Sequence, residues 1–362
     1  MNKTISLVMI VKNEERHLRR CLESVVKYVD EIIVVDTGST DQTKQIAAEF
    51  EAKIYDYIWN NDFAAARNFA LDKSNCDWCL VMDADEYISN EPSSTFQELM
   101  AYPTPVVGKV KINNKFQGQT GVEYEQSYIT RVFPSTCRYS GTIHEQINTD
   151  YPRIRINVEI EHDGYFQQAK GERNVPLLLA MIQQHPRDPY YYYQLAKEYR
   201  GLEQHQLTFE YLRKAYDLLT RQESYAPSLV VNYMYAMIAS GNLEFGIDVI
   251  NEEQEFLCEY PDFFFVSALY LLELIMSEPA KYEHLLSFIE QNYMRALEIG
   301  ENGQEGSIKG TGSYAAHHNL GVFYEVLGDV KHAKKQYAAA SMYHYEPSIE
   351  RLNVLENHHV QD

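Results

Sequence analysis

The sequence predicts an α/β domain built on a mostly parallel sheet, followed by a domain made entirely of paired helices. In the first third of the chain, short β-branched apolar runs alternate with segments of helical periodicity, which is typical of a sheet covered by helices. Beyond about residue 164, strand-like runs cease and a helix-pair pattern recurs. The 362 residues exceed the usual size of one domain. We therefore expect a first domain over residues 1–165 and a second over 166–362.

Four strands and three helices are expected before residue 85. Continuous apolar runs predict buried strands at 5–11, 31–36, 53–57 and 78–82. Apolar residues at helical spacing predict helices over 15–27, 45–50 and 63–73. Between about 105 and 160, alternating β-branched and aromatic residues with interspersed glycines predict a mixed β extension. Ligands bind such sheets at the carboxyl ends of the strands, so the loops after these strands are where we expect the site.

An internal repeat can be aligned in the second half. The last copy matches the small, large and aromatic positions of a tetratricopeptide (TPR) repeat, with His317, Leu320, Gly321, Tyr324, Gly328, Ala333, Tyr337 and Ala340. A second copy has Tyr192, Leu195, Ala196, Tyr199, Leu212 and Ala215, and a weaker one has Tyr233, Met237, Gly241, Gly246 and Ile250. Stacked helix pairs form an extended concave surface, so we expect it to bind a peptide or a second subunit, as in a homodimer. The alternative is a packing scaffold.

Composition excludes several classes of function. The net charge of −20 argues against a nucleic-acid partner, which requires clustered Lys and Arg. The first apolar run, 5–11, is too short for a membrane span and is followed at once by Lys12 and Glu14. Five cysteines in a chain of this length indicate a reducing, cytoplasmic setting. Cys76 and Cys79 have C-x-x-C spacing, but they lead into a strand and lack a second pair, so incidental strand cysteines are the favoured interpretation.

Asp83 and Asp85 follow the fourth expected strand and flank Ala84. Side chains two apart can fall on one side of such a transition, so one carboxylate can hold a cation directly and the other through water. Mg²⁺ or Mn²⁺ held there could bridge to a diphosphate and neutralise charge on the leaving group. The alternative is that these are solvated loop carboxylates that cap a helix.

Further polar residues occupy the neighbouring loops. Asp36 ends the second strand, where a carboxylate can accept hydrogen bonds from a ribose or a base N–H; it could instead cap the next helix, a role open also to Ser39 or Asp41. Val11, Asn13 and Glu14 occupy the loop after the first strand and could frame the base.

Two more groups of residues suggest phosphate binding and acid–base catalysis. Arg67, beside three alanines on the third helix, could present its guanidinium to a pyrophosphate, or form a surface ion pair with Asp62 or Asp72. After Arg131, the run from Gly141 to His144 and Glu145 could place a base next to a metal ligand, although a single His is more often structural.

Together these motifs resemble the family 2 glycosyltransferases of GT-A fold over roughly residues 4–165. The matching motifs are Val11-Lys12-Asn13-Glu14, the stretch Val35 to Thr43, Phe63-x-x-x-Arg67-Asn68, Asp83-Ala84-Asp85-Glu86 and Gly141-x-x-His144-Glu145. The resemblance implies inverting transfer from a nucleotide-diphosphate sugar. It implies a donor site formed by Val11, Asn13, Glu14, Asp36, Ser39, Arg67, Asp83, Ala84 and Arg131. It also implies a Mg²⁺ or Mn²⁺ site of Asp83, Asp85 and His144, and a catalytic pair of Glu145 and Asp85. Glu86 and Asp163 are alternative bases.

A transferase domain followed by helical repeats also resembles the bacterial glycocin S-glycosyltransferases, which modify peptides on Cys or Ser. The resemblance implies a UDP-hexose donor and a peptide acceptor. Sugar transferases of lipopolysaccharide-core and envelope assembly share the same motifs, so a saccharide acceptor is the alternative. A catalytically inactive repeat protein that only binds partners is a second alternative. Nucleotidyl transfer onto a sugar phosphate is disfavoured, because the loop after the first strand has no glycine.

Overall fold

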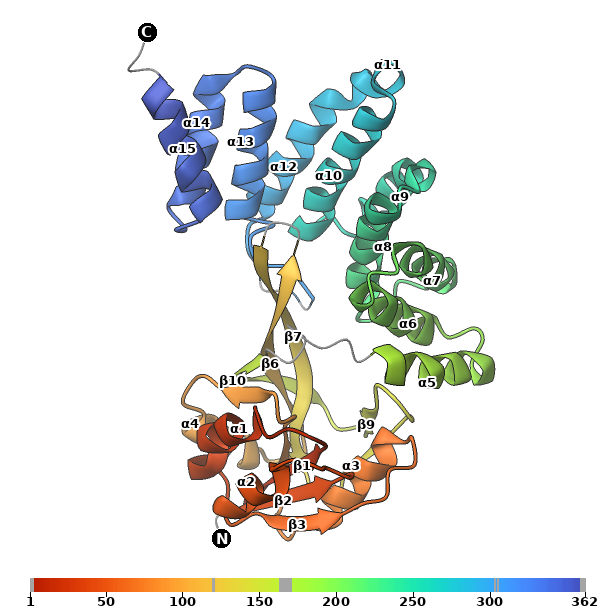
Figure 1. Cartoon of the computed structure of the whole chain (residues 1–362), viewed down its shortest axis with the longest axis vertical. Coiled ribbons are helices and arrows are strands. Elements are labelled where there is room, and N and C mark those ends of the chain that lie inside the picture. Colours follow the sequence, from red (N-terminus) through yellow and green to blue (C-terminus); the bar gives the residue numbers. More distant parts are fainter. Residues whose placement is uncertain (1–2, 119–120, 163–170, 303, 305, 359–362) are drawn as a thin grey trace. The chain divides into compact units, whose positions relative to one another are not determined.

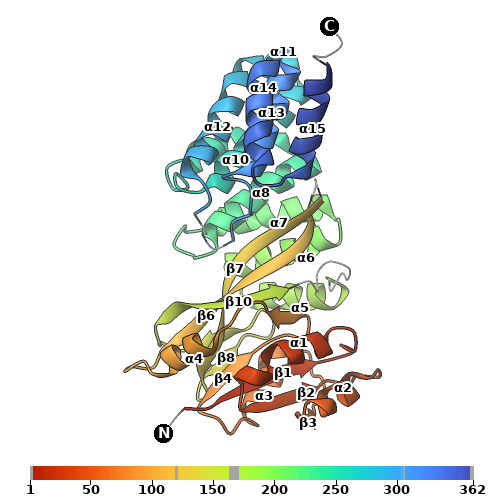
Figure 2. The same cartoon turned by 90° about the vertical axis from the view of Figure 1, so that its left-hand side faces the viewer.

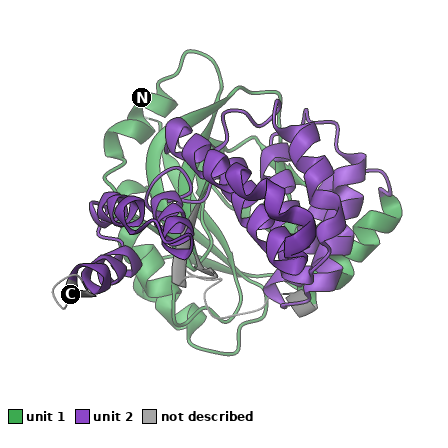
Figure 3. Cartoon of the chain, turned by 90° about the horizontal axis from the view of Figure 1, so that it is seen from above, with its two compact units in different colours: residues 1–184 green, residues 185–362 purple. Residues whose placement is uncertain are grey.

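The computed structural model describes residues 3–118, 121–162, 171–302, 304 and 306–358. The chain folds as two compact units, residues 1–184 and 185–362 (Figure 3). The boundary expected at residue 165 lies among residues 163–170, outside the described parts. Helix α5 (Gly171–Gln184), expected in the helical domain, belongs to the first unit.

Four parallel strands form one half of the eight-stranded sheet of the first unit. They are β3 (Lys53–Asp56), β2 (Glu31–Asp36), β1 (Ile5–Val11) and β4 (Trp78–Val81), in that order across the sheet. Register places Val11 beside Asp36, and Asp36 beside Asp56. The four predicted strands are thus present within one residue at each end. The apolar runs of β1, β2 and β4 are buried on both faces, whereas β3 is a partly exposed edge strand.

Helices cover both faces of this half-sheet. On one face of the eight-stranded sheet pack α1 (Leu18–Val25) and α2 (Thr43–Glu49), with α4 (Ser93–Met100) over its other half, and on the opposite face α3 (Phe63–Leu71). The first helix was expected from residue 15, but it begins three residues later because Glu14–His17 form a turn. It ends in a single 3-10 turn at Val26–Tyr28.

The predicted β extension completes the sheet. Strand β7 (Gly121–Pro134) pairs antiparallel with β4, and beyond it lie β6 (Val107–Gly118), β10 (Arg153–His162) and β5 (Glu86–Ile88). Figure 2 shows β6 and β7 as a long strand pair. The short pair β8 (Arg138–Ser140) and β9 (Gln146–Asn148) forms a second sheet. Strand β5 was not predicted: its three residues directly after the acidic motif carry no strand periodicity of their own.

In its described residues, the second unit consists of helices joined by turns and loops (Figure 1). Its α-helices are α6 (Pro189–Gly201), α7 (His205–Leu218), α8 (Ala226–Ser240), α9 (Gly246–Glu253), α10 (Pro261–Ser277), α11 (Pro279–Tyr282), α12 (Leu286–Ile299), α13 (Tyr314–Val326), α14 (Val330–Ser341) and α15 (Glu346–His358). Single 3-10 turns lie at Leu243–Phe245 and Glu283–Leu285. No described helix combines the length and hydropathy needed to cross a bilayer.

Each predicted repeat copy corresponds to one helix pair: α6 with α7, α8 with α9, and α13 with α14. Gly241 and Gly328 follow the first helix of their pairs with φ of +74° and +78°, a conformation that favours glycine. Gly321 packs under the ring of Tyr337: a Cβ at this position would lie 2.7 Å from a ring atom. The small and aromatic repeat positions therefore mark where the two helices of a pair approach most closely.

A buried carboxyl group lies in the first turn of α10. Asp262 is 3% exposed, and its Oδ1 accepts a hydrogen bond from the Ile308 N–H at 2.7 Å, while its Oδ2 is buried without a hydrogen-bond partner. Burial, with a smaller contribution from Glu301, raises the pKa of Asp262 to about 7. The helical unit therefore contains a group that ionises near neutral pH.

Because of the raised pKa of Asp262, we expect the helical unit to lose stability as pH rises. Because the folded pKa exceeds the unfolded value of 3.8, the native state holds the proton longer, and the free energy of unfolding should fall between pH 4 and 7 by about 4 kcal/mol in total. Urea unfolding of D262N should lack this slope and exceed wild type at pH 8. D248N, which changes an exposed acid in the first turn of α9, is the control. Parallel slopes for D262N and wild type would contradict the assignment.

Candidate functional site

The polar residues predicted from the loops gather at the carboxyl ends of β1, β2 and β4. Asp36, the last residue of β2, is 1% exposed. Its Oδ1 accepts hydrogen bonds from the N–H groups of Gly38 and Ser39, both at 2.9 Å, and lies 3.8 Å from Lys44 Nζ. Its Oδ2 is buried and has no hydrogen-bond partner in the structure. One oxygen thus holds the following turn, and the other remains an acceptor.

The loop after β1 is bound to the loop after β2. The Asn13 N–H donates to Ser39 Oγ at 2.9 Å, and Asn13 Oδ1 accepts from the Thr40 N–H at 2.8 Å. Asn13 adopts a φ of +57°, which Asn tolerates better than most residues. The Glu14 N–H donates to Thr43 Oγ1 at 2.8 Å, and the Val11 carbonyl accepts from Thr37. Val11, Asn13, Glu14 and Ser39 therefore shape the rim beside Asp36 mainly through these mutual bonds.

Asp83 lies between two arginines. Its Oδ1 accepts from Arg67 Nη2 at 2.8 Å, and its Oδ2 from Arg131 Nη2 at 3.0 Å. Arg67 also pairs through Nε with Glu145, and Arg131 through Nη2 with Glu86. The side chains of Arg67, Glu145, Arg131 and Glu86 are at most 10% exposed, whereas that of Asp83 is 36% exposed. We call these five residues the Arg–carboxylate cluster; two positive and three negative groups share it, and Asp83 is its open member.

The cluster shifts the proton affinities of its members. Burial alone would raise the pKa of Asp83, but Arg67 and Arg131 outweigh it and hold that pKa well below its usual value. Burial raises the pKa of Glu86, which Arg131 offsets only in part. Two guanidinium nitrogens, Arg67 Nη1 and Arg131 Nε, are buried without a hydrogen-bond partner. The cluster thus keeps Asp83 ionised and holds unsatisfied cationic donors, the chemistry that suits a phosphate oxygen.

The backbone orders the acidic motif itself. The Asp83 N–H donates to Glu86 Oε2 at 2.9 Å, and the Glu86 N–H donates to the Asp83 carbonyl at 3.1 Å. Ala84 is 5% exposed, and its side chain packs into the core on the α1 face. Glu86 therefore closes the turn that presents Asp83 and Asp85.

Glu145 reaches the cluster from the loop between β8 and β9. Gly141 and His144 turn this loop with φ values of +95° and +53°. Asn68 holds the strand from which this loop begins. Its Nδ2 donates to the Tyr139 carbonyl at 2.9 Å, and its Oδ1 accepts from the Tyr139 N–H at 2.8 Å. In the Arg67-Asn68 pair, the arginine thus holds Glu145 and the asparagine holds the strand that leads to it. The predicted surface pairing of Arg67 with Asp62 or Asp72 is wrong, since Asp62 caps α3 and Asp72 pairs with Arg138.

Asp85 faces a residue that is not among the predicted site residues. His162 Nε2 lies 3.4 Å from Asp85 Oδ2, and both side chains are at most 10% exposed. Burial would lower the pKa of His162, but the hydrogen bond to Asp85 and the charges of the acidic motif raise it above its usual value. The alternation Val158-x-Ile160-x-His162 places His162 on the core face of β10, at the end of that strand. That alternation is the sequence pattern from which a buried position for His162 could have been predicted.

The predicted cation trio of Asp83, Asp85 and His144 is not assembled. Among the residues that the structure describes, no three His, Cys, Asp or Glu side chains converge as a metal-binding group. The physical reason is that both oxygens of Asp83 are taken by arginines, while His162 lies against Asp85. Asp163, the alternative base, lies outside the described residues.

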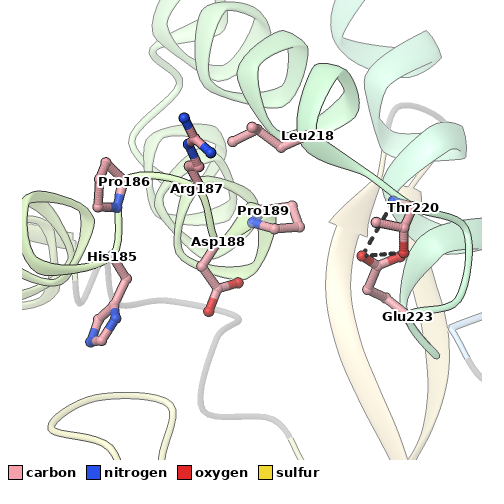
Figure 4. Close-up of a pocket in the computed structure, with 8 residues that line it drawn as sticks. All are labelled: His185, Pro186, Arg187, Asp188, Pro189, Leu218, Thr220 and Glu223. Carbon is pink, nitrogen blue, oxygen red and sulfur yellow. Dashed lines mark hydrogen bonds between the residues drawn. The ribbon is translucent and has the colours of Figure 1, made fainter.

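Two cavities are lined by residues that do not belong to the cluster. In the first unit, a small one of about 180 Å³ follows the bulge of β10, between Lys111 and Glu159. In the helical unit, one of about 600 Å³ lies between the start of α6 and the end of α7 (Figure 4). It is lined by His185, Pro186, Arg187, Asp188, Pro189, Leu218, Thr220 and Glu223. Glu223 accepts a hydrogen bond from Thr220 Oγ1 at 2.9 Å, and Asp188 caps α6.

The fold and the acidic strand ends define the class of the first unit: an α/β domain of GT-A type. Residues 6–156 match the family model described as Glycosyl transferase family 2. The first unit is therefore a glycosyltransferase domain of family 2.

The relatives of this chain include one protein named for TPR repeats and one named as a glycosyltransferase. A TPR repeat-containing protein of Synechococcus elongatus is 35% identical over 204 residues, 51% of this chain and 50% of that protein. The SPbeta prophage-derived glycosyltransferase SunS of Bacillus subtilis is 26% identical over 242 residues, 63% and 57% of the two chains. The chain thus spans about half the length of these relatives. Among solved structures, S. aureus TarS matches with 14% identity and a TM-score of 0.36, covering 64% of this chain and 54% of that one.

Proposed function

We propose that the first unit transfers a sugar from a nucleotide-diphosphate donor, a UDP-hexose, to an acceptor with inversion at the anomeric carbon. The main support for this proposal is the environment of the Asp36 carboxylate. Its buried Oδ2 has no hydrogen-bond partner, at the end of a parallel strand where such sheets bind nucleotides. A buried carboxylate oxygen without a partner is costly, and the N–H of a uracil base would satisfy it.

In this proposal the diphosphate lies near Asp83. Arg67 and Arg131 there carry buried donors without partners, which phosphate oxygens would accept. Asn13 and Ser39 would line the base from the edge of their loop, since the Ser39 hydroxyl already accepts from the Asn13 N–H and the Asn13 amide oxygen from the Thr40 N–H.

Asp85 and His162 are the residues we assign to the divalent cation. Their ligand atoms are 3.4 Å apart, close to the spacing of about 3 Å between neighbouring ligands around Mg²⁺ or Mn²⁺. A carboxylate with an imidazole suits Mn²⁺ better than Mg²⁺. When bound, the cation would neutralise charge on the departing diphosphate.

Glu145 is the proposed base. It would accept the proton from the acceptor hydroxyl or thiol as the acceptor atom bonds to the anomeric carbon and the bond to the diphosphate breaks. Arg67 holds this carboxylate in the cluster. Glu86 is less suited, because its side chain is 2% exposed and closes the turn of the acidic motif.

The proposed acceptor is a peptide, bound by the helical unit. TPR-like helix pairs form extended binding surfaces, and the 600 Å³ cavity at the start of α6 offers carboxylates beside prolines and Leu218. An envelope saccharide is the alternative acceptor. A homodimer through the helices, and a cytoplasmic location, stay predictions.

The direct test is to incubate the full chain with Mn²⁺, a panel of nucleotide sugars, and both peptide and saccharide acceptors, and to measure mass increments. A hexose increment on a peptide supports the proposal, and one on a saccharide favours the alternative acceptor. Absence of both binding and hydrolysis for every donor would overturn the proposal in favour of an inactive repeat protein.

The variant D36N tests whether Asp36 binds the nucleotide of the donor. Asn keeps the bonds to the turn but puts an N–H₂ group where the acceptor was, so UDP affinity should fall about 10- to 100-fold. D56N is the matched control, because Asp56 lies beside Asp36 in the sheet but its side chain is 78% exposed. Calorimetric titration with UDP measures both. Equal affinities for D36N and D56N would remove Asp36 from the donor site.

A further inference from the structure

A chain of hydrogen bonds leads from Asp85 through His162 into the neighbouring strands. His162 Nδ1 lies 2.8 Å from Asn114 Oδ1, and Asn114 Nδ2 donates to Ser127 Oγ at 3.2 Å. His162 and Asn114 are register partners in β10 and β6, and Asn114 and Ser127 lie on the antiparallel strands β6 and β7. The chain thus crosses three strands and ends on the side chain that faces Asp85.

The direction of these bonds indicates which imidazole nitrogen carries the proton. Because Ser127 takes up the amide nitrogen of Asn114, the amide oxygen is directed at His162 and can only accept. Nδ1 must therefore be the nitrogen that donates its proton, and Nε2 is turned toward Asp85 Oδ2. Side chains that bind metal through one imidazole nitrogen commonly donate the other N–H to an oxygen, which fixes the ring.

We propose that Asn114 is a positioning residue for the divalent cation: it holds the His162 ring so that Nε2 and the Asp85 carboxylate face one ion. This inference rests on the proposed cation site of Asp85 and His162. It adds that the geometry of that site is set from β6 and β7, by residues that do not contact the ion themselves.

Asn113 supplies a matched comparison within the same strand. It is the preceding residue, so its side chain points to the opposite face of the sheet. There Asn113 Nδ2 donates to Glu161 Oε1 at 2.6 Å, and its Oδ1 accepts from Gln126 at 3.1 Å. Removal of either amide breaks two hydrogen bonds in neighbouring strands, but only Asn114 is bonded to His162.

The experiment titrates Mn²⁺ alone into the full chain and follows free Mn²⁺ by electron paramagnetic resonance. N114A should weaken Mn²⁺ binding about 10- to 100-fold, the range for loss of an outer hydrogen bond to a ligating His. N113A should bind as wild type, and N114D, which keeps an acceptor oxygen, should retain most of the affinity. The ¹⁵N chemical shifts of His162 should show a protonated Nδ1 in wild type, and loss of the Nδ1 proton in favour of the Nε2–H tautomer that faces Asp85 in N114A.

Each outcome bears on the inference. If N114A does not fold, S127A replaces it, since loss of the Ser127 hydroxyl frees the Asn114 amide to turn and should also weaken binding. Wild-type affinity in N114A and S127A, or equal weakening in N113A, would overturn the role of Asn114. D85N separates the two proposals: if it abolishes Mn²⁺ binding while N114A does not, only this inference fails. If D85N also binds as wild type, the cation site itself is wrong, and the inference falls with it.

Discussion

D85N is expected to abolish cation-dependent sugar transfer, with a rate loss of about a thousandfold. The acidic motif presents Asp85 at the end of β4, facing His162, while the oxygens of Asp83 are engaged by arginines. Asp85, beside His162, is therefore the carboxylate of that motif to which we assign the divalent cation. Neutralisation of charge on a leaving diphosphate contributes several kcal/mol, and about 4 kcal/mol corresponds to a thousandfold.

The measurement is the initial rate of hexose transfer or UDP release as a function of Mn²⁺ concentration. D77N is the control, since Asp77 precedes the amino end of the same strand and its side chain is exposed. A D85N enzyme with the wild-type rate and the wild-type Mn²⁺ dependence would rule out the assigned role.

R131M is expected to cause the largest loss of stability in the first unit, about 3–5 kcal/mol. Arg131 is 7% exposed and pairs with both Asp83 and Glu86. Without it, Glu86 is left as a buried carboxylate with no cation beside it, and removal of one partner of a buried pair carries a penalty of this size. The deficit should shrink as pH falls, because the raised pKa of Glu86 allows it to take up a proton.

Urea unfolding of the full chain, read by a probe in the first unit, measures this effect. R138M is the control: Arg138 pairs with Asp72 at the surface, so its loss should cost less than about 1 kcal/mol. In the R131M background, E86Q should recover part of the lost stability. If R131M and R138M are equally stable, the buried cluster does not stabilise the fold in this way.

Much of the fold follows from local sequence. The runs 5–11 and 31–36 are apolar on both faces, which only a covered parallel strand accommodates, and they form β1 and β2. The TPR positions also follow, because Gly321 must be small where Tyr337 packs on it. Strand β5 could not be predicted from local sequence, since its three residues become a strand only by pairing with β10.

For the candidate site, too, some features could be predicted from the sequence and others required the tertiary structure. The sequence by itself indicated which loops carry the candidate residues, because the carboxyl ends of parallel strands meet at one edge. The site roles of Asp36, Arg67, Asp83, Asp85, Arg131 and Glu145 stay predictions. Only the tertiary structure decided how they pair: Asp83 with two arginines, and Asp85 with His162 in place of His144. Those pairings, together with that of Arg67 and Glu145, join strands and loops up to 78 residues apart. Which charges neutralise one another there depends on the register of β7 and β10, which no local pattern specifies.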